Sequence, residues 1–75
     1  MLDTIAQVMA QILQVPKETI ARDSSPETID RWDSLKHMQL IMALEDEFEV
    51  QFPDESIPEL LNVRLIEEKL SELKA

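Results

Sequence analysis

The feature that most constrains the fold is a regular apolar pattern that begins shortly after Ser34. Its main members are Leu40, Ile41, Leu44 and Phe48. At 100° per residue these side chains fall within one arc, which predicts a helix over about residues 34–48. We therefore expect Ser34 at or just inside the N-terminus of this helix. Free backbone N–H groups and the positive end of the helix dipole make that position suitable for a phosphate.

The same predicted helix has a second apolar stripe on roughly its opposite side. It consists of Leu35, Met38 and Met42. A helix with two apolar faces is either enclosed in the core or presents one face to another molecule. The stripe begins beside Ser34 and holds two methionines, whose flexible side chains suit adaptable contacts. We therefore interpret it as a partner-docking face, with a core position as the alternative.

Three more helical segments are predicted. The first runs from about Leu2 to Gln14 and ends before Pro16, because a residue preceding proline is pushed out of helical geometry. A short helix is expected at Ser56, with Pro58 in its first turn. The last begins at an Asn62 cap, and its inward stripe is Val63, Ile66, Leu70 and Leu73.

A long connection, residues 15–33, joins the first two main helices. Ser25-Pro26-Glu27 predicts one helical turn within it, with serine at the cap and proline at the first position. Trp32 is interpreted as a cover for the open end of the bundle, or alternatively as a contact for an attached group or a partner. These elements predict an all-α fold: a small up-down bundle of three main helices plus one short helix, with a long first loop, in a single domain over residues 1–75.

The charge is strongly acidic and unevenly placed. Sixteen acidic residues against seven basic ones give a formal charge of -9, which argues against nucleic acid as a partner. Lys and Arg are absent between Lys36 and Arg64, where the acids are Glu45, Asp46, Glu47, Glu49, Asp54, Glu55 and Glu59. One side of the molecule is therefore expected to be negative and to suit a basic patch on another protein.

Several kinds of site are not expected. The chain lacks cysteine, so it has neither a disulfide nor thiol chemistry of its own, and its acids lack the alternation and central glycine of a calcium loop. His37 lies three residues from Ser34, but no third group or glycine-shaped turn accompanies the pair, so we expect a histidine at the core edge rather than a catalytic base. With no apolar run of about 20 residues and no secretory signal, a cytoplasmic protein is expected.

The run Asp33-Ser34-Leu35, opening a helix that continues to Phe48, resembles the acyl carrier protein family over residues 5–73. In that family the serine carries 4'-phosphopantetheine, which a phosphopantetheinyl transferase attaches from coenzyme A. The resemblance implies that Ser34 is the attachment site, that Asp33 and Leu35 flank it, and that Asp33 helps to hold the magnesium of the transferase. It also implies that the chain is not an enzyme.

The resemblance further implies that the arm holds acyl groups as thioesters and presents them to partner enzymes. The expected docking surface is Leu35, Met38, Met42, Glu45, Asp46 and Glu47, facing acyl-loading and acyl-transferring enzymes with basic docking patches. The chain itself is expected to be a monomer. Lys36 and Gln39 stand where the fatty-acid-synthesis branch has acids, and the glycine common before the motif is absent. A specialised lipid, polyketide or polysaccharide-modification pathway is therefore expected.

Two alternatives stay open at this point. A peptidyl, aryl or D-alanyl carrier would share the bundle and the arm but load an amino acid. Asp33 and the strong acidity favour the acyl branch. An unmodified helical interaction module would use Ser34 only as a helix cap and the methionine stripe as a binding face.

Overall fold

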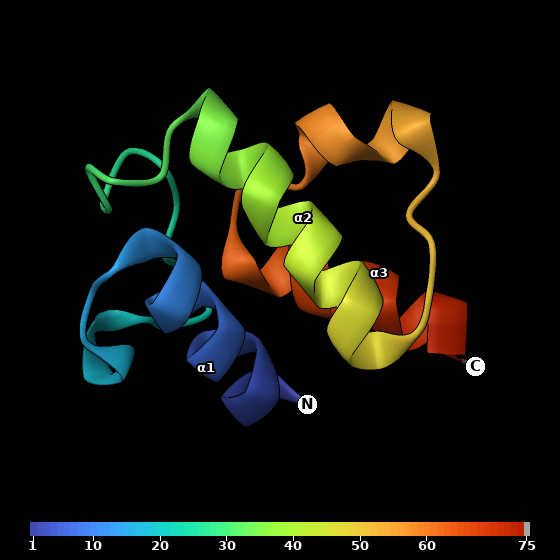
Figure 1. The fold of residues 1–75 in the computed structure, drawn as a ribbon, viewed down its shortest axis with the longest axis horizontal. Helices are drawn as coiled ribbons and strands as arrows, with labels where there is room; N and C mark the ends of the chain where they lie inside the picture. The colour runs from blue at the N-terminus through green and yellow to red at the C-terminus, as the bar shows by residue number, and fades with distance from the viewer. Residues whose placement is uncertain (75) are drawn as a thin grey trace.

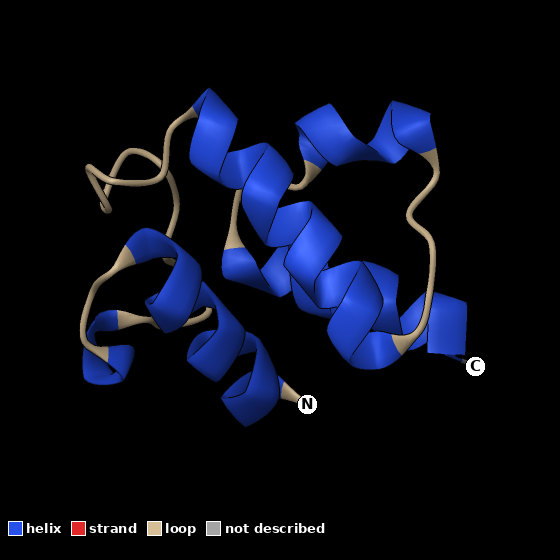
Figure 2. Cartoon of the chain, in the orientation of Figure 1, coloured by secondary structure: helices blue, strands red, loops and turns tan. Residues whose placement is uncertain are grey.

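Three helices and two short 3-10 segments make up the regular structure of residues 1–74, the part of the chain that the computed structural model describes. The elements are α1 (Leu2–Leu13), η1 (Lys17–Thr19), α2 (Ser34–Phe48), η2 (Asp54–Glu59) and α3 (Val63–Lys74). Figure 2 shows helices and loops without strands in this part of the chain. The all-α prediction is confirmed, and α2 has the predicted bounds.

The direction of the chain changes twice (Figure 1). α1 and α2 pack together and run in opposite senses. The segment after α2 then crosses to η2, which runs back toward the start of α2, so that α3 follows the same sense as α2. The return along η2 allows α3 to run in the same sense as α2, and η2 lies close to the N-terminal half of α2.

The ends of the helices follow from local chemistry. α1 and α2 both stop at a residue in the left-handed region, Gln14 with φ 58° and Glu49 with φ 55°. Glycine normally takes this position, but the chain has none, so each of the two residues accepts a conformation that disfavours a Cβ by about 1–2 kcal/mol. At the other end, the Asn62 side chain accepts a hydrogen bond from the Leu65 amide at 2.8 Å. The predicted cap of α3 is confirmed.

The core gathers one face of each helix around α2. It is made of residues that are almost fully shielded from solvent: Ile5, Met9, Leu13, Ile29, Trp32, Leu40, Ile41, Leu44, Phe52, Leu60, Val63, Ile66 and Leu70. The predicted inner face of α2 is confirmed for Leu40, Ile41 and Leu44, while Phe48 is half-buried and packs against the core. The second stripe is not part of the core, because Leu35, Met38 and Met42 are 66%, 47% and 62% exposed.

The long first loop is fixed by the backbone of α3. The amides of Val63 and Arg64 donate to the carbonyls of Ser24 and Arg22, at 3.1 and 3.0 Å. The Arg22 guanidinium also pairs with Glu67 at 3.0 Å. The first N–H groups of a helix have no partner within it, so the loop supplies acceptors that α3 would otherwise lack.

Inside this loop the single helical turn predicted at Ser25 is confirmed. The Ile29 amide donates to the Ser25 carbonyl at 2.9 Å, and the Glu27 amide donates to the Ser25 hydroxyl at 3.2 Å. The helical segment of the loop is η1 instead, which the sequence did not predict. The expected short helix at Ser56 is present as η2 and begins two residues earlier, at Asp54.

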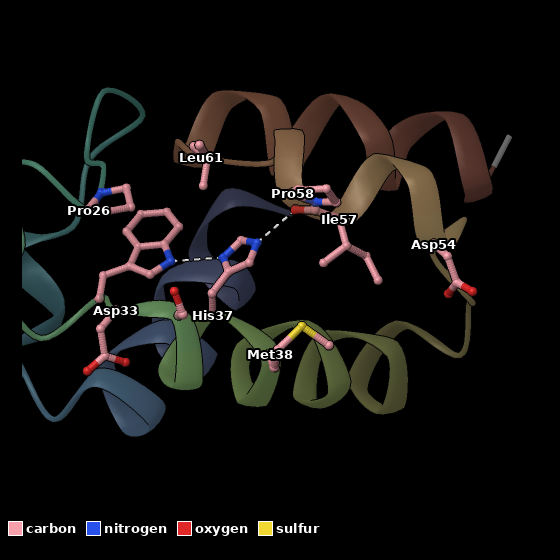
Figure 3. Close-up of a pocket in the computed structure, with 10 residues that line it drawn as sticks. Pro26, Asp33, His37, Met38, Asp54, Ile57, Pro58 and Leu61 are labelled. Atoms are coloured by element: carbon pink, nitrogen blue, oxygen red, sulfur yellow. Dashed lines mark hydrogen bonds between the residues drawn. The ribbon is translucent and has the colours of Figure 1, made fainter.

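A buried polar bridge holds the start of α2 against η2 (Figure 3). The Trp32 indole N–H donates to Nδ1 of His37 at 3.0 Å, and Nε2 of His37 lies 2.8 Å from the carbonyl oxygen of Ile57. Because indole can only donate and a carbonyl can only accept, the imidazole is neutral with its hydrogen on Nε2. The two rings also stack, with centroids 6.0 Å apart and 24° between their planes. Trp32 therefore fills the end of the bundle, as its simpler interpretation predicted.

We predict that Trp32 and His37 are energetically coupled through this bridge. Trp32→Phe keeps an aromatic ring but leaves the Nδ1 acceptor of His37 buried without a donor, and the unpaired group lowers the free energy of unfolding by about 1–3 kcal/mol. In a His37→Leu background the same substitution removes no hydrogen bond, and it measures the smaller ring together with the removal of an indole N–H that already lacks its acceptor. Denaturant unfolding of the four proteins is expected to give a coupling energy of about 0.5–3 kcal/mol. A coupling energy of zero would contradict the prediction.

Candidate functional site

Ser34 is the first residue of α2, and its side chain is exposed. The residue before it, Asp33, caps the helix: its backbone is extended, and its Oδ1 accepts a hydrogen bond from the Lys36 amide at 2.8 Å. This cap was not predicted, although aspartate directly before an apolar helical pattern is a sufficient signal for one. The alternative in which Ser34 serves as the helix cap is wrong, since Asp33 performs that task.

His37 does not act on Ser34. It is 7% exposed, and both of its ring nitrogens bond to other groups, the Trp32 indole and the Ile57 carbonyl. The expectation that His37 sits at the core edge is confirmed. Its side chain orients the segment around Ser34 and offers no free nitrogen to take the serine proton.

An open, largely apolar groove of about 790 Å³ adjoins Ser34 (Figure 3). Its lining comes from the first loop, the start of α2, and η2 with the residues that follow it. The residues that line it are Pro26, Trp32, Asp33, Ser34, His37, Met38, Asp54, Ile57, Pro58 and Leu61. Met38 therefore belongs both to the exposed stripe of α2 and to the groove, whereas Leu35 and Met42 belong to the stripe alone.

The three acids predicted for the docking surface differ in their surroundings. Asp46 and Glu47 are exposed. Glu45 is half-buried, and its Oε2 accepts a hydrogen bond from the Phe52 amide at 2.8 Å. Glu45 thus holds the segment after α2 in place, a role that nothing in the sequence indicated.

The acid-rich segment between Lys36 and Arg64 takes no part in the ion pairs found among residues 1–74. Those pairs join Lys17 with Asp3, Arg22 with Glu67, and Lys69 with Glu72. The exposed acids of the segment therefore leave a negative surface that runs from the second half of α2 through η2.

Two further observations concern the same described residues. No group of three or more histidine, cysteine or acidic side chains among them is arranged to hold a metal ion. None of the helices formed by residues 1–74 has the length and apolar character needed to cross a membrane.

Comparison with known proteins points to one family. A family model described as "Phosphopantetheine attachment site" matches residues 3–70. "Acyl carrier protein 3" of Ralstonia nicotianae is 40% identical over 55 residues, which is 73% of this chain and 63% of that relative. The match thus spans less than two thirds of the relative's length.

A solved structure shows the same fold. The solution NMR structure of a holo acyl carrier protein from Geobacter metallireducens matches with a TM-score of 0.87 and 29% sequence identity, over 97% of this chain and 84% of that one. An exposed serine hydroxyl at a capped helix start, beside an apolar groove, fits the prosthetic group of such proteins. The chain belongs to the phosphopantetheine-attachment family, whose prosthetic group is phosphopantetheine, and it is similar in sequence and fold to acyl carrier proteins.

Proposed function

We propose that Ser34 carries 4'-phosphopantetheine, and that the chain uses this arm to hold acyl groups as thioesters for partner enzymes. The observation that supports the proposal is the position of Ser34, exposed at the first residue of α2 while Asp33 provides the cap. The hydroxyl is free to be modified without loss of the cap. A phosphodiester at this point would lie at the positive end of the helix, where negative charge is favoured.

The attachment step uses Ser34 once, in the active site of a phosphopantetheinyl transferase. The Ser34 oxygen forms a bond to the phosphorus that bears the pantetheine as the pyrophosphate of coenzyme A breaks, and adenosine 3',5'-bisphosphate leaves with the bonding electrons. The serine proton passes to a base of the transferase. Asp33 holds the Lys36 amide with one carboxylate oxygen, which leaves the other oxygen for the magnesium ion used there.

The docking surface is proposed on the outer face of α2. Leu35, Met38 and Met42 offer an exposed apolar stripe beside the attachment site, and Asp46 and Glu47 supply charge at its far end. An enzyme with an apolar patch rimmed by Lys and Arg would match this arrangement. Glu45 contributes charge to the same surface, but its hydrogen bond to the Phe52 amide commits it to the fold as well.

A specialised pathway is proposed for this carrier. Lys36 and Gln39 place a positive and a neutral side chain at the start of α2, where carriers of general fatty-acid synthesis have acids. Enzymes that bind an acidic N-terminal turn of this helix would contact a different charge on this chain. Lipid, polyketide or polysaccharide-modifying enzymes are therefore the proposed partners.

The modification is testable by intact mass. After incubation with coenzyme A and a broad-specificity phosphopantetheinyl transferase, the wild-type chain is expected to gain the mass of one phosphopantetheine. Ser34→Ala is expected to gain none and to unfold at the same denaturant concentration, because Asp33 keeps the helix capped. Ser25→Ala, which changes a serine of the first loop, is the matched control and should still be modified. A wild-type chain that gains no mass would contradict the proposal.

The docking surface is testable by charge reversal. Asp46→Lys combined with Glu47→Lys is expected to slow modification by the transferase about tenfold at low salt, because electrostatic steering is lost. Glu18→Lys combined with Asp23→Lys makes the same change in net charge on exposed residues of the first loop and should leave the rate nearly unchanged. Intact mass measured at quenched time points gives the rates at several salt concentrations. The difference in rate between the two double variants should become smaller as salt screens the attraction between charges. Equal rates at low salt would rule out this surface.

A further inference from the structure

The hydrogen-bonded bridge of Trp32, His37 and Ile57 lies between the groove and the core. His37 lies on the inner face of α2, in line with the buried Leu40, Ile41 and Leu44, while Ile57 packs against the core from η2. Figure 3 shows the imidazole between the indole and the Ile57 carbonyl, and all three residues line the groove. Anything that passed from the groove into the core between α2 and η2 at this point would have to separate these groups.

Separating them would leave polar groups without partners. Among the described residues, no buried side-chain nitrogen or oxygen lacks a hydrogen-bond partner. An apolar chain inserted here would offer no replacement for the indole N–H, the two imidazole nitrogens or the Ile57 carbonyl. A small acyl group fits the groove without breaking the bridge, because the groove volume of about 790 Å³ lies within the range of about 300–1,000 Å³ typical of small-molecule sites.

We propose that Trp32 and His37 determine the cargo class of this carrier by keeping the acyl group in the surface groove and out of the bundle core. This inference rests on the attachment to Ser34 proposed above. The cargo class is then short acyl groups, because a short chain finds apolar contact at Met38, Pro58 and Leu61 without displacing the bridge. A long chain would either project into solvent or have to break the bridge, so long chains are poorly protected.

The methionines of the chain provide the probes. Met9 is fully buried in the core, Met38 lines the groove, and Met42 is exposed on α2 outside it. Protein labelled with 13C at the methionine methyl groups is loaded by a broad-specificity transferase from acetyl-, butanoyl- and octanoyl-coenzyme A. Intact mass confirms each loading before the methyl resonances are recorded.

For the wild-type chain, the Met38 methyl resonance is expected to shift between the acetyl and butanoyl forms, while those of Met9 and Met42 stay in place in all three acyl forms. A Met9 resonance that moves with chain length would overturn the inference, because the acyl group would then have entered the core. An unmoved Met38 resonance would overturn it as well, because the groove would be empty. A chain that gains no mass overturns the Ser34 attachment and this inference with it, whereas a loaded chain with a moving Met9 overturns this inference alone.

Variants of the bridge test its role as the determinant. His37→Ala removes both hydrogen bonds, and octanoyl loading is then expected to move the Met9 resonance where acetyl loading does not. His37→Gln is the conservative control, since an amide has both a donor and an acceptor, and it should behave as the wild-type chain does. If His37→Ala does not fold, Trp32→Phe replaces it. If a bridge variant folds and its Met9 resonance does not shift on octanoyl loading, then His37 and Trp32 do not determine the cargo class.

Discussion

The position of Ser34 depends on one imidazole that forms a hydrogen bond through each of its two ring nitrogens. His37 accepts from the indole of Trp32 and donates to the backbone of η2, so a single side chain links the end of the first loop, α2 and η2. Ser34 lies three residues earlier, one turn away on the same helix. With the neutral tautomer fixed on both sides, the N-terminal turn of α2 has a defined place against η2, and the groove beside Ser34 is a consequence of that placement.

α2 serves two environments with opposite faces. Its inner face packs in the core, while the stripe of Leu35, Met38 and Met42 remains exposed next to Ser34. Exposed apolar side chains of this size in one contiguous stripe are typical of a surface that meets other molecules. On the docking surface proposed above, Asp46 and Glu47 would supply long-range attraction, and the apolar stripe would supply the short-range contact.

The sequence was sufficient for features with a local or periodic signal. The bounds of α2 follow from its apolar spacing, and the Asn62 cap of α3 follows from residue preference. It was insufficient where the partner is a backbone group remote in the chain, as for the Ile57 carbonyl on His37 or the Phe52 amide on Glu45, because any residue supplies such a group. The three residues of η1 are too few to show a period. The place of Ser34 at the start of α2 was predictable from the same apolar spacing, whereas the groove beside it required the fold.

The hydrogen bonds between the first loop and α3 have a consequence for local unfolding of the molecule. The amides of Val63 and Arg64 donate to loop carbonyls only while the loop stays in place. The loop in turn keeps these hydrogen bonds only while the first turn of α3 is helical. Neither segment can open by itself without exposing the other. We therefore regard the loop and the first turn of α3 as one cooperative unit of local unfolding, whose amide protons exchange with solvent in the same rare events. Since Leu61 of the groove lies just before this unit, a transient opening there would loosen one wall of the groove while α2 and its serine stay folded.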